Sequence, residues 1–306
     1  MRRKMSRVSE DKWRQTGWYH RARGSRDLFS FVGSLGGYSS NSRIAWRGMA
    51  SSDFDLVSSL QRVPGNDTEP RLRQAELTIL EAAREWGLGF GPGGWMTDLH
   101  LLADLQHYGT STRLIDVTSN PMTALWFACQ DPRDAGDVAG DGVLLAINTA
   151  TWSRYGRARQ PLTYSAQDDP QGWELSSALQ NEQPFVVESL VPNDRLRAQE
   201  GFFLAGKIPD ALQPGDPFTS LQIPFQRTDP ELLRQRLRAR SSSRVGPTDQ
   251  FPFVAVLIPQ ELKERVRVRL ENSYNRRAAV LFPDFAGFRD FTRAAVAREE
   301  ILDKRP

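Results

Sequence analysis

The segment from Gln106 to Ala128, QHYGTSTRLIDVTSNPMTALWFA, constrains the fold more than any other part of this chain. It places a His-Tyr-Gly corner, an Arg and an Asp separated by two aliphatic residues, and a Thr-Ser-Asn-Pro helix start directly before an apolar helix. Polar groups at that density beside core-forming residues are costly to bury unless each one is paired. The segment therefore predicts either a dedicated site or a tightly hydrogen-bonded structural corner.

The composition is otherwise that of an ordinary globular protein. The chain has 306 residues, of which 39% are hydrophobic and 25% charged, so it can bury a substantial core in one large or two modest domains. No apolar run approaches the ~20 residues that span a bilayer. The basic N-terminus is not followed by the apolar core of an export signal. We therefore expect a cytoplasmic protein that does not bind a membrane.

Cysteine and histidine are too scarce for the common metal sites. Cys129 is the only cysteine, which excludes an intramolecular disulfide and fits a reducing compartment. With three histidines besides, a zinc site of the usual Cys/His type cannot be assembled. We predict no metal site, and only a metal held by carboxylates stays open.

Residues 1–26 are rich in Arg and Lys and carry only two acidic residues, Glu10 and Asp11. Such an arm can bind nucleic acid, although a solvated, partly ordered terminus is the commoner outcome. The net charge of the whole chain is only +3. Nucleic acid is therefore kept as a candidate partner for this arm alone.

Hydrophobic periodicity and turn residues predict helices mainly in the first half of the chain and strands mainly in the second. The predicted helices lie at residues 69–86, 97–108, 121–128, 229–239 and 259–270, and Asp27 is expected to cap a further short one. The predicted strands lie at residues 44–48, 142–148, 184–190, 201–205, 221–224 and 253–258. Residues 87–95 are expected to be irregular, and 149–183 and 240–250 to be surface excursions. This order favours an α+β fold with a mixed or antiparallel central sheet, in one domain over residues 27–300.

Three motifs follow one another along the chain. The first is Trp46-Arg47-Gly48, the second is the segment 106–128, and the third is Arg195, Gln199, Gly201 and Phe203 in an Arg-x-x-x-Gln-x-Gly-x-Phe pattern. Together they resemble the FRG domain family, which is named for a Phe-Arg-Gly motif and has a Gln-His-(Tyr)-Gly-x-x-Thr-Arg-Leu-Leu-Asp-x-Thr-x-Asn-Pro block. The chain departs from that pattern at Trp46, Ser111, Ile115 and Val117. The resemblance spans roughly residues 40–290.

The order of these elements is also distantly similar to that of ADP-ribosyltransferases of the Arg-Ser-Glu type. In those enzymes an Arg on the first strand contacts the dinucleotide, a Ser/Thr segment shapes the nicotinamide pocket and a Glu orients the ribose. The likeness carries these roles to Arg47, to Thr118-Ser119 and to Gln199-Glu200. It implies an ADP-ribosyltransferase-like fold with NAD as the substrate. The adjacent Gln199-Glu200 departs from the spaced Gln-x-Glu of that superfamily, which leaves the glutamate's role in doubt.

These considerations select two sets of candidate residues. The candidate catalytic residues are Glu200, Gln199 and His107. The candidate ligand-binding residues are Arg47, Gly48, Tyr108, Arg113, Asp116 and Thr118.

Most candidates also have a structural interpretation. Arg47 can clamp a phosphate or carboxylate, with Gly48 letting the ligand approach the backbone, or it can pair with Asp116. His107 at a helix end can simply hydrogen-bond the last carbonyls, and Tyr108 can serve the core.

Two further roles stay open along the same segments. Thr118 or Ser119 is placed to cap the helix that Pro121 begins. Glu200 can be an ordinary surface residue, and Glu182 and Glu188 are rivals for any carboxylate role.

Three functions remain. The first is an NAD-using transferase or glycohydrolase that acts as a toxin-like or anti-phage effector, since a carboxylate stabilises the charge that develops when the nicotinamide–ribose bond breaks. The second is a non-catalytic sensor of a nucleotide or phosphorylated ligand, and the third is a nucleic-acid-binding protein. The chain contains no P-loop, Rossmann fingerprint, nucleophile elbow or His-Glu-x-x-His motif.

Overall fold

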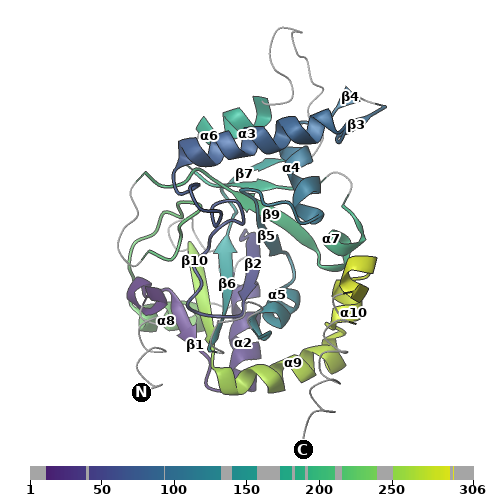
Figure 1. The fold of residues 1–306 in the computed structure, drawn as a ribbon. Coiled ribbons are helices and arrows are strands. Elements are labelled where there is room, and N and C mark those ends of the chain that lie inside the picture. The colour runs from purple at the N-terminus through teal and green to yellow at the C-terminus, as the bar shows by residue number, and fades with distance from the viewer. Residues whose placement is uncertain are drawn as a thin grey trace, which may run out of the picture.

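The computed structural model describes residues 12–38, 41–92, 94–131, 140–156, 173–180, 183–189, 192–210, 216–239, 251–289 and 292. At the centre of these residues is a mixed eight-stranded sheet with the order β1-β10-β6-β2-β5-β9-β8-β7 (Figure 1). The strands of this sheet are β1 (Tyr19–Arg21), β2 (Ile44–Met49), β5 (Ile115–Thr118), β6 (Gly142–Asn148), β7 (Ser153–Tyr155), β8 (Phe185–Val187), β9 (Gly201–Ala205) and β10 (Phe253–Ile258). A separate hairpin joins β3 (Phe90–Gly91) to β4 (Gly94–Trp95).

The helices lie along the whole chain. They are α2 (Ser25–Gly36), α3 (Glu69–Glu85), α4 (Asp98–His107), α5 (Pro121–Ala128), α6 (Trp173–Gln180), α7 (Asp194–Ala198), α8 (Pro230–Ala239), α9 (Gln260–Tyr274) and α10 (Ala278–Leu281).

The main core is built on β6 and β10, which pair antiparallel over six residues of each strand. Their sequences, GVLLAIN and FVAVLI, are nearly continuous apolar runs, and every residue of β10 is buried. Strands that read this way are covered on both faces. Buried residues of α2, α5 and α9 belong to the same core, and these helices lie together at the foot of the sheet in Figure 1.

A second core lies at the other end of the sheet, where α3, α4 and α6 lie (Figure 1). Leu80, Leu102 and Leu175 supply its helical side, and Phe203 supplies part of its strand side. The next residue of β9, Leu204, belongs to the main core instead, because successive side chains of a strand point to opposite faces.

Between these cores two neighbouring strands of the sheet diverge. β2 pairs with β6 along its whole length, from Ile44 to Met49, but with β5 only at Trp46 and Thr118. β5 instead follows β9 through four residue pairs. The sheet therefore opens between β2 and β5 beyond this single pair.

The α+β class with a mixed sheet is confirmed, and most predicted helices and strands are present within one or two residues. Residues 221–224 form no strand, and the segment 87–95 contains the β3–β4 hairpin rather than being wholly irregular. Asp27 does not cap α2, which begins at Ser25 after Gly24. The Asp27 carboxylate accepts from the backbone N–H of Arg23 instead.

Two segments that were predicted to be a partly ordered arm and a surface excursion contribute to the sheet and to the core. Within the basic arm, Trp13 is fully buried and β1 pairs with β10. Within residues 149–183, β7 closes one edge of the sheet and α6 buries Leu175. Residues 1–11, 157–172 and 240–250 lie outside the described residues, so nucleic-acid binding by the arm stays a prediction.

None of the described helices combines the length and the apolar character that crossing a membrane requires.

Candidate functional site

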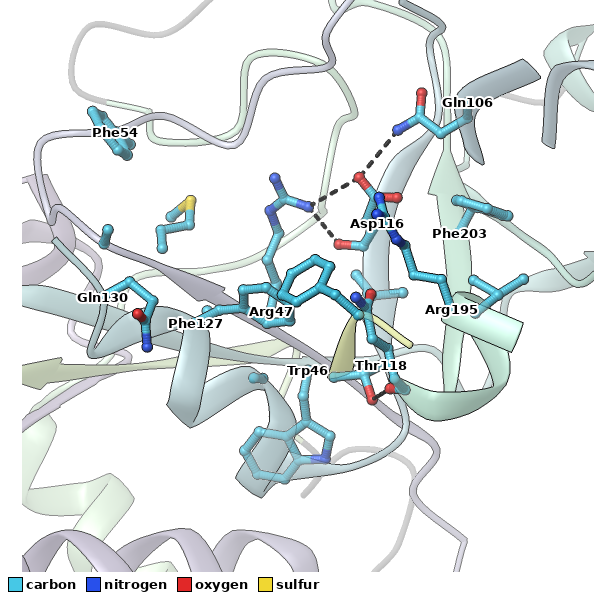
Figure 2. A pocket seen from close by; sticks show the side chains of 18 of the residues that line it. Trp46, Arg47, Phe54, Gln106, Asp116, Thr118, Phe127, Gln130, Arg195 and Phe203 are labelled. Atoms are coloured by element: carbon cyan, nitrogen blue, oxygen red, sulfur yellow. Dashed lines mark hydrogen bonds and ion pairs between the residues drawn. The ribbon is translucent and has the colours of Figure 1, made fainter. Parts of the chain in front are cut away.

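A cavity of about 550 Å³ opens where β2 and β5 diverge (Figure 2). This volume falls within the range of small-molecule binding sites. Its wall combines cationic, carboxylate and aromatic side chains from β2, β5, α5, α7 and β9. The residues that carry the argument below are Trp46, Arg47, Gly48, Phe54, Arg62, Gln106, His107, Asp116, Thr118, Phe127, Arg195, Gln199, Phe203 and Phe282.

Arg47 lies at the centre of this wall (Figure 2). Its Nη1 donates to the main-chain oxygen of Asp116 and lies 4.0 Å from that residue's Oδ2. Its Nε is buried and has no hydrogen-bond partner among the described residues. Burial lowers the pKa of Arg47, Asp116 opposes that shift, and Arg62 adds to it. The guanidinium makes one hydrogen bond with the described residues, to the oxygen of Asp116, and its Nη2 makes none, so the group has N–H donors left for a ligand.

Asp116 is the carboxylate that faces Arg47 across the opening. Its side chain is 64% exposed, and its Oδ2 accepts from Gln106 Nε2 at 3.0 Å. Gln106 is itself oriented, since its Oε1 accepts from Thr112 Oγ1 at 2.7 Å. The carboxylate is therefore held from one side and open toward the cavity on the other (Figure 2).

Arg195 and Gln199 reach the cavity from α7 and its C-terminal cap. They are four residues apart and so lie on one helical face. The Arg195 guanidinium donates two hydrogen bonds to Asp284, at 2.7 and 2.9 Å, and lies over the ring of Phe282. Gln199 Nε2 donates to the oxygen of Leu281 at 2.9 Å. Both contacts fix the segment that carries Phe282 against α7.

His107 lines the cavity at the end of α4, whereas its neighbour Tyr108 does not. The pKa of His107 is lowered, first by burial and then by Arg195, against the opposing charges of Asp284 and other carboxylates. A histidine with a lowered pKa is neutral at neutral pH. Tyr108 is 83% exposed, so its predicted role in ligand binding would need a ligand that extends beyond the cavity.

Thr118 is the last residue of β5, and its side chain contacts the turn that precedes β9. Its Oγ1 donates to the main-chain oxygen of Gln199 at 2.6 Å and accepts from the N–H of Asn120. The cap of α5 is Asn120, whose side chain accepts from Met122 N at 2.9 Å. The prediction that Thr118 or Ser119 caps this helix is therefore wrong, because Asn120 directly precedes Pro121 and the Thr118 hydroxyl is engaged by Gln199 and Asn120.

Arg113 lies away from the cavity in a buried ion cluster. It is 2% exposed, and its guanidinium donates to both carboxylate oxygens of Glu76, to Glu69 and to the oxygen of Gly206. Four of the five N–H groups of the guanidinium thus bond to protein. This geometry favours a structural role for Arg113 over the predicted role in ligand binding.

Glu200 also lies outside this cavity, although Gln199 lines it. Glu200 adopts a left-handed φ of 51° in the turn between α7 and β9. Its Oε1 accepts from Asn120 Nδ2 at 2.8 Å and from Arg276 Nη2 at 2.9 Å. The carboxylate that the sequence favoured for catalysis therefore faces a second cavity on the other side of this turn. Of its rivals, Glu188 also lines that second cavity and Glu182 lies outside the described residues.

Gly48 is needed for packing rather than for room at the ligand. A Cβ at this position would lie 1.8 Å from the oxygen of Ala124 and 2.6 Å from the nitrogen of Ala128. The backbone of β2 thus touches the backbone of α5. Helix α5 then presents Phe127 to the cavity.

We predict that Gly48→Ala destabilises the protein by at least about 1–3 kcal/mol, the usual cost of overpacking a core. The contact is with backbone, which cannot move aside without shifting α5. Urea unfolding measures the loss. Gly33→Ala is the matched control, because that helical position has nothing within 4 Å of an added Cβ and alanine favours a helix. Equal stability of the two variants would contradict the assigned role of Gly48.

Six predicted site residues thus share the cavity, and three lie elsewhere. Those that share it are Arg47, Gly48, His107, Asp116, Thr118 and Gln199. The others are Tyr108, Arg113 and Glu200. Sequence reasoning did not assign Arg62, Arg195 or the ring of Phe282 to the site. Arg195 was detectable in principle, since it precedes Gln199 by one helical turn in the third motif.

Among the described residues, no three His, Cys, Asp or Glu side chains are grouped so that they could hold a metal ion.

Comparison with protein families gives a match between residues 42–137 and the family described as FRG domain. The match includes β2, α3, α4, β5 and α5, and is shorter than the range that the motifs suggest. Comparisons with curated proteins and with solved structures give no significant match. The cavity is completed by Arg195, Gln199, Phe203 and Phe282, which lie beyond the matched residues.

Proposed function

The chain contains an FRG domain, and we propose that the cavity between β2 and β5 binds NAD and that the protein acts on it as an ADP-ribosyltransferase-like transferase or a glycohydrolase. The observation that carries this proposal is the Arg47–Asp116 pair at the centre of a cavity of about 550 Å³. An arginine and a carboxylate in one cavity supply the two charges that this reaction needs.

The cationic side chains suit the pyrophosphate of a dinucleotide. The Arg47 guanidinium makes only one hydrogen bond with the described residues, and Arg62 and Arg195 line the same cavity. Guanidinium groups bind phosphate oxygens in paired, charge-assisted hydrogen bonds. The rings of Phe127 and Phe282 offer apolar surface for a base or for nicotinamide.

The arrangement of the strands agrees with the same proposal. Arg47, Thr118 and Gln199 belong to β2, to β5 and to the turn that leads into β9, which are neighbours in the sheet. Thr118 Oγ1 is bonded directly to Gln199. The three segments that the ADP-ribosyltransferase likeness selected from the sequence are thus adjacent in space, which supports the likeness without any match to a solved structure.

Asp55, Asp116 and Asp131 line the cavity, and among them Asp116 lies beside Arg47, whereas Glu200 does not line the cavity. In the proposed reaction the bond between ribose C1′ and the nicotinamide nitrogen breaks, and its electron pair neutralises the pyridinium. Asp116 stabilises the oxocarbenium charge that develops on the ribose. Water, or the hydroxyl or amine of an acceptor, then adds to C1′ and loses its proton to Asp116 or to solvent. Consumption of NAD in this way would suit a cytoplasmic toxin or phage-defence effector.

The experiment is incubation of the purified chain with NAD and measurement of released nicotinamide. We expect Asp116→Asn to lower the rate by about a hundredfold or more, as is usual for loss of a charged catalytic group, and to leave NAD binding nearly unchanged. Glu200→Gln is the matched control and should keep its activity, since that carboxylate faces the other cavity. Loss of activity in Glu200→Gln but not in Asp116→Asn would reverse the two roles.

A non-catalytic nucleotide-binding module is the second candidate. It is favoured by the position of Glu200, because the glutamate expected from the likeness is absent from the cavity. The same experiment separates the candidates: NAD that binds with no release of nicotinamide, in the presence or absence of an acceptor protein, would favour binding alone.

A further inference from the structure

A second cavity, of about 540 Å³, lies across the sheet from the first. The two cavities share one wall, the hydrogen-bonded segments Thr118-Ser119 and Gln199-Glu200. Thr118 and Gln199 line the first cavity, and Ser119 and Glu200 line the second. On β9, Phe203 lines the first and Phe202 the second, as adjacent residues of a strand do when they face opposite sides. The second cavity is therefore a separate site.

Three arginines from distant parts of the chain surround this second cavity. Arg43 precedes β2, Arg154 lies on β7, and Arg197 lies on α7. The guanidinium of Arg154 is already engaged, since its Nη1 donates to Glu188 Oε1 at 2.6 Å. The guanidinium groups of Arg43 and Arg197 make no hydrogen bond or ion pair with any residue that the structure describes.

The carboxylates of this cavity do not offset those two charges. Glu188 is paired with Arg154. Glu200 accepts from Asn120 and forms an ion pair with Arg276. Each acid among the described residues that line the cavity therefore already has its own cation, and Arg43 and Arg197 leave an excess of two positive charges among those residues.

The position of Arg43 is fixed by its backbone. Its main-chain oxygen accepts from both the N–H and the Oγ1 of Thr149, at 2.7 and 2.9 Å. Arg197 is held likewise by its place in α7, where its N–H donates to Asn193. Two cationic side chains thus start from ordered backbone on separate walls of one cavity, which reduces the entropy lost on binding a ligand.

We propose that this second cavity is a binding site for a small phosphorylated molecule, held by Arg43 and Arg197. A phosphate group suits two unpaired guanidinium groups better than a carboxylate does, because it carries up to two charges and three oxygens that accept paired hydrogen bonds. The volume is that of a site for a nucleotide-sized ligand rather than for a polymer. The site does not depend on the activity of the first cavity.

The test is a calorimetric titration of the full chain with inorganic pyrophosphate. We expect two binding events in the wild type, of which Arg47→Ala removes one. The double variant Arg43→Ala/Arg197→Ala should weaken the affinity of the other binding event by about a hundredfold. Each charge-assisted hydrogen bond contributes about tenfold or more to the affinity. The matched control is Arg265→Ala/Arg269→Ala, which removes two exposed charges from α9 and should change neither event.

Three results would overturn this proposal. The first is unchanged pyrophosphate binding in the Arg43/Arg197 variant, and the second is equal affinity for acetate and pyrophosphate. The third is binding of a single-stranded oligonucleotide without binding of pyrophosphate, which would make the cavity part of a nucleic-acid groove. Arg43→Gln/Arg197→Gln gives an independent check on folding, because both side chains are exposed.

Discussion

ADP-ribose, the part of NAD that remains after nicotinamide leaves, is expected to bind Arg47→Ala about a hundredfold more weakly than the wild type. The reason is that the guanidinium supplies a charge and N–H groups of which only one is hydrogen-bonded to the described residues, and each charge-assisted hydrogen bond contributes roughly 1.5–3 kcal/mol. Arg47→Lys should recover only part of the loss, since an ammonium cannot form the paired hydrogen bonds of a guanidinium. Titration calorimetry measures the three affinities.

Two controls separate this loss from damage to the fold. Arg47 Nη1 also donates to the main-chain oxygen of Asp116, so urea unfolding of each variant must accompany the titration. Arg265→Ala removes one charge from an exposed position on α9 and should bind ADP-ribose normally. A folded Arg47→Ala variant with an affinity within twofold of the wild type would contradict the proposed role of Arg47.

Arg113→Met should destabilise the protein by up to about 3–5 kcal/mol, the usual cost of removing one partner of a buried ion pair, because Glu76 would keep only the partly exposed Arg73 as a cation. Glu76, which accepts two hydrogen bonds from Arg113, is fully buried. Burial lowers the pKa of Arg113, but the charges and hydrogen bonds of Glu76 and Glu69 raise it above its ordinary value. The cluster thus favours the charged form strongly. Urea unfolding of the purified variants measures the loss.

The surface pair between Arg71 of α3 and Asp67, which precedes that helix, provides the control for this prediction. Both of its side chains are mostly exposed, so Arg71→Met should cost at most about 1 kcal/mol. Replacing Arg113 and Glu76 together by apolar residues should recover part of the stability. If Arg113→Met were as stable as Arg71→Met but bound ADP-ribose poorly, Arg113 would belong to the ligand site and not to the core.

The local part of the fold could be predicted from the sequence because its determinants are local. The apolar run lies within the single strand β10, and the amphipathic pattern lies within the few turns of helix α3. β5 was not assigned as a strand, since its four residues are flanked by polar groups that equally suit a corner. Its pairing with β9 joins residues more than 80 positions apart, and no local pattern contains that information.

In the candidate site, too, the sequence predicted local motifs but not the contacts between distant segments. The motifs identified Arg47 and Asp116, which do lie together. They could not show that Gly48 meets the backbone of α5, because glycine permits both a ligand and a helix to come close. Nor could they show on which side of the wall each residue of Gln199-Glu200 lies. That depends on the left-handed conformation of Glu200, which directs its carboxylate to Asn120 and Arg276.

The position of bound ADP-ribose in a crystal of the full chain tests the central proposal most directly. We predict density for the pyrophosphate beside Arg47, in the cavity that Asp116, Arg195 and Phe282 also line. Density for the nucleotide only in the second cavity, or nowhere at saturating concentration, would contradict the assignment of the cavity between β2 and β5 as an NAD-binding site.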